Sequence, residues 1–238
     1  MNRTQFSKII NAINSILLPR VCFGCNAHLL DAEHLLCTVC RHDLPVTGHN
    51  FLKENEVDQT FYGRIRIKKA ASLLYFSPTG TVKNLLHHLK YKNQELIGEF
   101  LGDWFGKTLK RQGHLKAVDY VIPVPLHPKK LKKRGYNQVD AFGKSMAKHL
   151  KAQFLGDALY KTANTRTQTK KDRLFRWKSS QNLYEPNPDY SLSGKKVLLV
   201  DDVITTGATI EACAKALSTV KAIEIYVATM AFVPKLGS

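Results

Sequence analysis

The segment that most restricts the fold of this chain is an apolar run that ends in two aspartates and continues into a threonine-rich turn. It reads Val197-Leu198-Leu199-Val200-Asp201-Asp202-Val203-Ile204-Thr205-Thr206-Gly207-Ala208-Thr209. The apolar half predicts a buried strand, and residues 207–218 have the spacing of a helix. A strand that delivers two carboxylates to the start of a helix is typical of an α/β sheet, which binds its ligands at the carboxyl ends of the strands.

The two ends of this segment suit two parts of one ligand. Carboxylates accept hydrogen bonds from sugar hydroxyls, whereas the free N–H groups and the dipole at a helix start attract a phosphate. A ribose phosphate satisfies both ends, and a hydrated magnesium ion fits the same acidic surroundings. An ordinary strand followed by a capped helix is the alternative interpretation. The sequence contains neither G-x-x-x-x-G-K-[ST] nor G-x-G-x-x-G, so the motifs of P-loop and dinucleotide sites are absent.

Strand and helix patterns alternate along most of the chain, and we find no internal repeat. Strands are predicted over residues 70–76, 118–124, 158–161, 196–200 and 223–232, and helices over residues 81–91, 94–109, 137–150 and 207–218. This order predicts a parallel sheet flanked by helices.

Four of the five cysteines form a unit of two C-x-x-C pairs. They are Cys22, Cys25, Cys37 and Cys40, and eleven residues separate the pairs. This spacing lets four thiolates reach one tetrahedral zinc ion, which is then structural because no coordination position stays open. Redox dithiols or disulfides are the alternative. Cys213 stands alone in a predicted helix and is expected to be buried.

Positive charge is concentrated in the middle of the chain. The net charge is +17, and residues 128–178 contain 15 of the 36 Lys and Arg residues but 3 of the 19 Asp and Glu residues. Such a concentration favours contact with phosphates or nucleic acid over an evenly solvated surface. The densest run, His127-Pro128-Lys129-Lys130-Leu131-Lys132-Lys133-Arg134-Gly135-Tyr136-Asn137-Gln138, follows a predicted strand, and Asn137 is placed to cap the next helix. Pyrophosphate, DNA and plain solvent remain as its partners.

The composition changes near residue 57, which predicts two units. Residues 1–57 are expected to form an N-terminal helix and a four-cysteine module, and residues 58–238 an α/β domain. The apolar spacing of residues 6–17 predicts an amphipathic helix that docks on the chain's own core. With no apolar run long enough for a membrane helix and no signal-peptide pattern, we expect a cytoplasmic protein without membrane insertion.

The segment from Val197 to Thr209 resembles the phosphoribosyl pyrophosphate signature of type I phosphoribosyltransferases. The whole chain, with its four-cysteine head and the Arg134-Gly135-Tyr136-Asn137-Gln138 string, resembles the ComF/GntX family of competence-associated proteins. The resemblance covers Cys22 to Val233. It implies a type I phosphoribosyltransferase-like sheet, with magnesium bound together with phosphoribosyl pyrophosphate.

The resemblance also implies roles for individual residues. Asp201 and Asp202 would contact the ribose hydroxyls, directly or through magnesium, and would be the catalytic carboxylates of an active enzyme. The 5′-phosphate would lie in the turn formed by Thr205, Thr206, Gly207, Ala208 and Thr209. Pyrophosphate contacts would fall on Lys129, Lys130, Lys132, Lys133, Arg134, Gly135, Asn137 and Gln138. A mobile loop would contribute Thr167, Gln168 and Arg173, and Lys90 either reaches a phosphate or lies on the surface.

Three functions of different classes follow. The first is a competence protein of this fold that binds phosphoribosyl pyrophosphate or a nucleotide and assists the import of single-stranded DNA, beside an ATP-driven DNA-uptake helicase. The second is an active phosphoribosyltransferase of nucleotide metabolism. The third is a zinc-headed DNA-binding adaptor whose sugar-phosphate pocket is vestigial. A fold alone does not decide among them.

Overall fold

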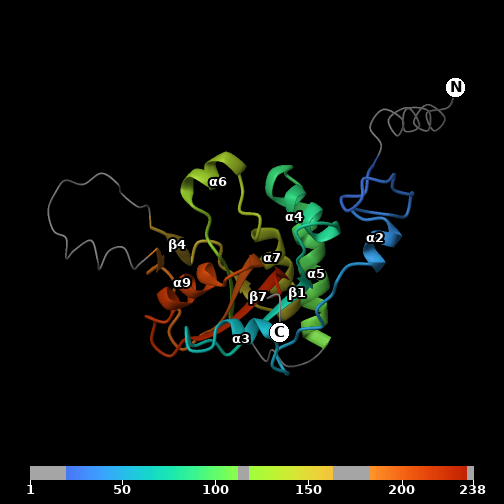
Figure 1. The fold of residues 1–238 in the computed structure, drawn as a ribbon. Coiled ribbons are helices and arrows are strands. Elements are labelled where there is room, and N and C mark those ends of the chain that lie inside the picture. The colour runs from blue at the N-terminus through green and yellow to red at the C-terminus, as the bar shows by residue number, and fades with distance from the viewer. Residues whose placement is uncertain (1–19, 112–117, 163–182, 235–238) are drawn as a thin grey trace.

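The computed structural model describes residues 20–111, 118–162 and 183–234. Their centre is a five-stranded parallel sheet of order β1-β7-β6-β2-β3 (Figure 1). Its strands are β1 (Lys69–Tyr75), β2 (Tyr120–Pro123), β3 (Gln153–Phe154), β6 (Lys196–Ile204) and β7 (Glu224–Phe232). β4 (Leu159–Lys161) and β5 (Tyr184–Pro186) form a separate antiparallel pair. The predicted parallel sheet is therefore confirmed.

The central strands are apolar because both of their faces are covered. Leu198 and Val200 of β6 belong to one buried cluster, whereas Val197 and Leu199 belong to a second cluster on the opposite face. Alternate side chains of a strand point to opposite faces, so a strand covered on both faces loses the usual polar alternation. This explains the continuous apolar run before Asp201.

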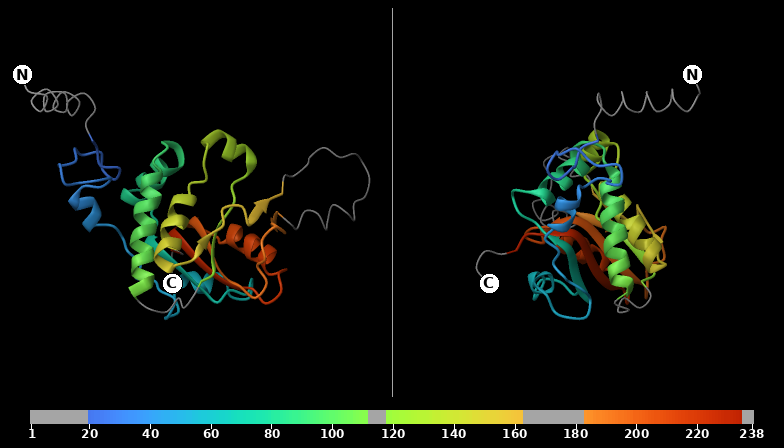
Figure 2. Two further views of the ribbon diagram at one scale, coloured as in Figure 1. Left: turned by 180° about the vertical axis from the view of Figure 1, so that it is seen from behind. Right: turned by 90° about the vertical axis from the view of Figure 1, so that its right-hand side faces the viewer.

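Helices cover both faces of the sheet (Figure 2). The helices are α3 (Glu56–Thr60), α4 (Thr81–Tyr91), α5 (Glu95–Arg111), α7 (Asp140–Leu150) and α9 (Ala208–Leu217). The first cluster includes α4, α5 and α7, and the second includes α3 and α9. α5 and α7 pack so closely that no side chain fits at Gly102, where a Cβ would lie 2.4 Å from the carbonyl oxygen of Phe142.

The structure corrects two predictions around the basic run. First, residues 128–134, which lie outside the helices predicted from the sequence, form a helix, α6 (Pro128–Arg134). Pro128 occupies its first turn, His127 accepts a hydrogen bond from the Lys129 N–H, and Gly135 ends it in the left-handed conformation at φ 80°. Second, the N-cap of α7 is Val139 rather than Asn137. Asn137 lies in the turn before the helix, where its Oδ1 accepts the Val139 N–H at 3.3 Å and its side-chain nitrogen donates to the carbonyl oxygen of Val124 at 3.0 Å.

The four-cysteine segment forms a small module at the N-terminal side of the sheet domain. We call residues 20–44 the cysteine module; it contains α2 (Thr38–His42) and packs on α4. The side chain of Asn84 donates to the carbonyl oxygen of Gly24 at 2.6 Å, and the rings of Phe23 and His88 lie 4.8 Å apart. The amphipathic helix predicted for residues 6–17 lies outside the described residues. Within residues 20–111, 118–162 and 183–234, no helix is long and apolar enough to cross a membrane.

Candidate functional site

The acidic pair, Asp201 and Asp202, lies near the carboxyl end of β6. The strand continues to Ile204, four residues beyond its predicted end, because β7 pairs with it as far as Phe232. Each aspartate is 8% exposed. The Asp202 N–H donates to Asp201 Oδ1 at 2.8 Å, so the pair is fixed by the backbone as well as by burial.

Asp201 and Asp202 have different electrostatic surroundings. Burial, followed by the charge of Asp202, raises the pKa of Asp201 well above its ordinary value. Asp202 has a cation beside it, because the ammonium of Lys90 lies 2.7 Å from Asp202 Oδ2. Gln138 donates to the same oxygen at 2.9 Å. The structure thus brings Lys90 from α4 and Gln138 from the turn before α7 to the acidic pair.

The turn of residues 205–209 is open to solvent beside these buried carboxylates. Thr205, Thr206 and Thr209 are exposed, and Thr206 Oγ1 accepts from the Ala208 N–H at 3.4 Å. Gly207 is the N-cap of α9 in the left-handed conformation at φ 75°, and a Cβ there would lie 2.7 Å from the ring of Phe61. Glycine is therefore required both by the backbone and by the close packing of α3 below the turn.

Arg64, in the segment between α3 and β1, contacts both the turn and α9. The sequence did not predict Arg64 as a site residue. Its guanidinium donates to the carbonyl oxygen of Thr206 at 2.8 Å and forms an ion pair with Glu211 of α9 at 2.5 Å. A lone arginine carries no motif, so only the tertiary structure relates it to the turn. Lys90, by contrast, lies in a segment that matches the family pattern.

The predicted pyrophosphate residues divide into an exposed and an inward group. Lys129, Lys130, Lys132 and Lys133 are exposed on α6. Arg134 lies 5.2 Å from the centroid of the Tyr91 ring and donates to Gln138 Oε1 at 2.5 Å. Asn137 and Gln138 are buried, at 8% and 5% exposure. The inward group therefore links the basic run to Asp202, whereas the four lysines remain available to a ligand.

A cleft of about 690 Å³ lies between the end of α4 and α6. It is lined by Lys90, Tyr91, Lys92, Asn93, Lys130, Lys133, Arg134, Gly135 and Tyr136. Five of these nine residues are cationic and none is a carboxylate, so the cleft suits an anion. Since Lys90 also contacts Asp202, the cleft adjoins the acidic pair.

The four cysteines converge on one point. Their Sγ atoms all lie within 4.8 Å of one another, and the Sγ atoms of Cys25 and Cys37 are 3.8 Å apart, too far for a disulfide. Zn–S bonds of about 2.3 Å in a tetrahedron place sulfurs about 3.8 Å apart. Cys22 Sγ accepts N–H groups from Gly24 and Cys37; burial opposes the thiolate, but these and further donors lower the pKa of Cys22 to about 7. The cluster can therefore hold a metal ion.

Other predicted residues lie elsewhere. Thr167, Gln168 and Arg173 fall outside the described residues. Cys213 is fully buried, as expected.

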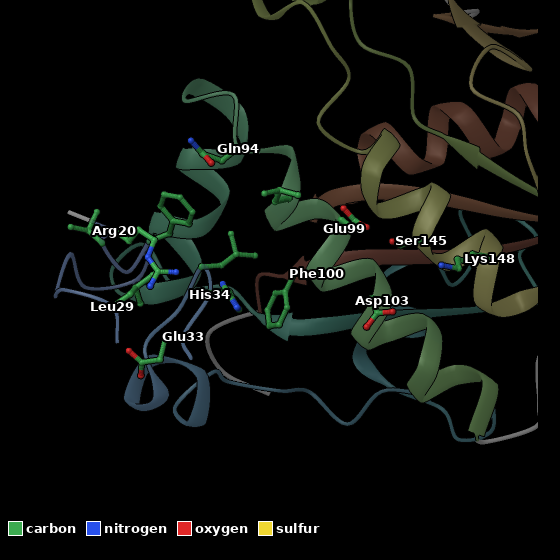
Figure 3. Close-up of a pocket in the computed structure, with 14 residues that line it drawn as sticks. Arg20, Leu29, Glu33, His34, Gln94, Glu99, Phe100, Asp103, Ser145 and Lys148 are labelled. Atoms are coloured by element: carbon green, nitrogen blue, oxygen red, sulfur yellow. The ribbon is translucent and has the colours of Figure 1, made fainter. Parts of the chain in front are cut away.

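A second hollow, of about 710 Å³, lies in the seam between the cysteine module and α5 (Figure 3). Leu29 and His34 of the module face Phe100 and Asp103 of α5 across it. Its lining is largely apolar and contains neither the acidic pair nor α6, so this hollow is distinct from the anion cleft.

Comparisons with known proteins agree with this architecture. A model of the phosphoribosyl transferase domain matches residues 141–236. Competence protein F of Haemophilus influenzae is 27% identical over 220 residues, which cover 87% of this chain and 94% of that protein. Competence protein ComFC of Bacillus subtilis is 26% identical, over 90% of this chain and 85% of that protein.

These matches support a ComF-family, phosphoribosyltransferase-like protein. Another relative, DNA utilization protein YhgH of Escherichia coli O157:H7, is 28% identical over 56% of the chain and 59% of that protein. Among solved structures, adenine phosphoribosyltransferase from Saccharomyces cerevisiae is similar over 59% of this chain and 72% of that chain, with 19% identity and a TM-score of 0.37. The matched domain and the parallel sheet flanked by helices give the chain a type I phosphoribosyltransferase fold, with a four-cysteine cluster near its N-terminus.

Proposed function

We propose that this ComF-family protein binds phosphoribosyl pyrophosphate, or a nucleotide that carries a ribose phosphate, and assists the import of single-stranded DNA in natural transformation. The observation that supports ligand binding is the position of two buried carboxylates two residues before an exposed threonine turn at the start of α9. The competence and DNA-utilization names of the relatives support the second half.

Each part of the ligand has a group of residues suited to it. Asp201 and Asp202 accept hydrogen bonds from the ribose hydroxyls, and the turn of residues 205–209 holds the 5′-phosphate with hydroxyls and free N–H groups. The pyrophosphate lies toward the cationic cleft, where Arg134 and the α6 lysines neutralise it. In the proposal, Thr167, Gln168 and Arg173 close over the ligand from outside the described residues.

The proposal also assigns the metals and the two units. Zinc is the ion of the cysteine cluster, since four thiolates at tetrahedral spacing are its usual structural ligands. Magnesium enters with the pyrophosphate of the ligand. Residues 1–57 then form the zinc unit and residues 58–238 the ligand-binding unit, and an ATP-driven helicase is the proposed partner in DNA uptake.

Calorimetric titration of phosphoribosyl pyrophosphate with magnesium tests the binding function. Wild-type protein is compared with Asp202→Asn and with the control Asp189→Asn, an exposed acid outside the site. Loss of a hydrogen bond to a charged acceptor weakens binding by about ten- to a hundredfold, so Asp202→Asn should bind that much more weakly while Asp189→Asn stays at the wild-type value. No binding by wild type, or equal binding by Asp202→Asn, contradicts the proposal.

A DNA-binding adaptor without ligand binding is the second candidate. One observation favours it: four lysines of α6 are exposed with no carboxylate among the residues that line the adjoining cleft. Single-stranded DNA affinity that depends steeply on salt and is unaffected by Asp202→Asn would support the adaptor.

A further inference from the structure

The oxygens of Asp202 are already engaged in hydrogen bonds and an ion pair. Oδ2 lies 2.7 Å from the ammonium of Lys90 and 2.9 Å from the amide nitrogen of Gln138, and Oδ1 accepts the Val203 N–H at 2.6 Å. A carboxylate offers about four acceptor positions, so three of them are occupied. Little of this carboxylate remains for a metal ion.

Asp201 does not add a second free carboxylate. Its Oδ1 accepts the Asp202 N–H, and its side chain is buried beside a like charge. Burial, followed by the adjacent charge of Asp202, raises the pKa of Asp201. The Asp202 carboxylate faces one ammonium, that of Lys90.

Lys90 is held in place rather than free on the surface. It lies in the last turn of α4, and its side chain is 25% exposed. The hydroxyl of Tyr136 donates to the carbonyl oxygen of the preceding residue, Leu89. At its other end α4 is fixed to the cysteine module by Asn84. The ammonium is therefore positioned by the fold at Asp202.

The residues present do not fit a magnesium ion bound directly to the acidic pair. Magnesium requires near-octahedral oxygen ligands at about 2.0–2.1 Å, and a second cation would be repelled by the adjacent ammonium. The neighbouring cleft also needs no metal for charge neutralisation, because Lys130, Lys133 and Arg134 line it together with Lys90.

We propose that the ammonium of Lys90 is the resident cation of the acidic pair, and that a ribose phosphate binds at Asp202 without a divalent ion on these carboxylates. The proposal rests on the proposed ribose-phosphate function. Magnesium that accompanies phosphoribosyl pyrophosphate is then bound by the pyrophosphate alone. Lys90 contacts Asp202 and also lines the anion cleft.

Calorimetry with ribose 5-phosphate tests the proposal, because this probe lacks the pyrophosphate that itself chelates magnesium. Zinc-loaded protein is titrated in metal-depleted buffer and again with magnesium chloride. Wild type should bind equally in both, whereas Lys90→Met should bind about tenfold more weakly without magnesium, as expected when a charge-assisted contact is removed, and recover with it. Lys90→Arg should behave as wild type, and so should Lys83→Met, an exposed lysine of the same helix. Wild-type binding that requires magnesium, or a Lys90→Met variant equal to wild type in both buffers, overturns the proposal.

A second measurement does not depend on sugar binding. Manganese(II) replaces magnesium at oxygen sites and is followed by electron paramagnetic resonance as it is added to zinc-loaded protein. Lys90→Met should gain one manganese site that wild type lacks, and the double variant Lys90→Met/Asp202→Asn should lose it. A manganese site at Asp202 in wild type, or no gained site in Lys90→Met, overturns the resident-cation proposal. If no variant binds ribose 5-phosphate, the ribose-phosphate function fails, and the manganese result still decides the role of Lys90.

Discussion

Asp140, in the first turn of α7, shows how a single buried carboxyl affects stability. Its Oδ1 atom is buried without a hydrogen-bond partner. Burial raises the pKa of Asp140 to about 6; Lys144 opposes the shift and Glu95 adds to it. Since the folded state holds the proton more tightly than the unfolded chain, the free energy of unfolding falls as the pH rises from about 4 to about 6. Above a pH of about 6 the full loss in the free energy of unfolding is present.

Asp140→Asn should therefore stabilise the protein at neutral pH. The pKa shift corresponds to a few kcal/mol, and partial exposure of the side chain reduces the expected gain to about 1 kcal/mol at pH 7. Urea unfolding of both proteins at several pH values measures the difference. The difference in the free energy of unfolding should disappear toward pH 4, where both side chains are neutral. A variant less stable than wild type at pH 7 would contradict a destabilising role of the Asp140 carboxylate.

The site residues whose mutual arrangement the sequence predicted lie in one short segment. Asp201, Asp202 and the turn of residues 205–209 are close in sequence, and their local strand-turn-helix structure alone places them at one sheet edge. Arg64, which was not predicted, and Gln138, which was expected at the pyrophosphate and contacts Asp202, reach the same site from positions distant in sequence. Their roles depend on which elements the fold brings together, and no spacing in the sequence encodes this.

Among the elements, the long ones were predicted, and of the short ones only β2 and β4 were. The helix predicted over residues 81–91 is α4 with the same bounds. β3 has two residues and β5 three, too few for a periodic pattern, and their pairing is fixed by neighbouring strands. The sequence of α6 contains two residues typical of helix ends, Pro128 in the first turn and Gly135 after the last. The run of lysines between them has no apolar periodicity that would predict a helix.

The four lysines of α6 form the surface that should contact DNA. Changing Lys129, Lys130, Lys132 and Lys133 together to Gln should weaken single-stranded DNA binding and reduce the salt slope by as much as about 3, because each phosphate that a lysine neutralises adds about 0.7 to the slope. Fluorescence anisotropy at several salt concentrations measures both. The matched control changes four exposed lysines elsewhere to Gln, giving the same net charge: Lys53, Lys107, Lys110 and Lys221. An equal fall in the slope for both variants would mean that net charge alone attracts the DNA.

At the scale of the whole molecule, α4 connects the cysteine cluster to the acidic pair. Its first turn lies against the cluster, where Thr81 Oγ1 donates to Cys40 Sγ at 3.7 Å. Gly24 packs so closely that a Cβ there would lie 2.7 Å from the Thr81 side chain. In its last turn Lys90 contacts Asp202. One helix of eleven residues therefore has contacts at both candidate sites.

The metal should consequently influence the order of α4. We expect about one zinc per chain, absent from Cys22→Ser and retained in Cys213→Ala, because Cys213 lies outside the cluster. Elemental analysis of reduced protein measures the zinc content.

A structural zinc site stabilises its fold by about 10 kcal/mol or more, so the cysteine module should unfold when zinc is removed. The Asn84 and Thr81 contacts then disappear, and amide hydrogen exchange should accelerate in residues 81–91 as well as in residues 20–44.

Helix α9 provides the internal control for this experiment, since its buried residues belong to the cluster on the opposite face of the sheet. Its exchange should stay unchanged when zinc is removed. Faster exchange throughout the chain would mean that zinc loss unfolds the whole molecule, and unchanged exchange in α4 would mean that its packing on α5 is sufficient. Faster exchange confined to the module and α4 is the result expected if the cysteine cluster supports the helix that presents Lys90 to Asp202.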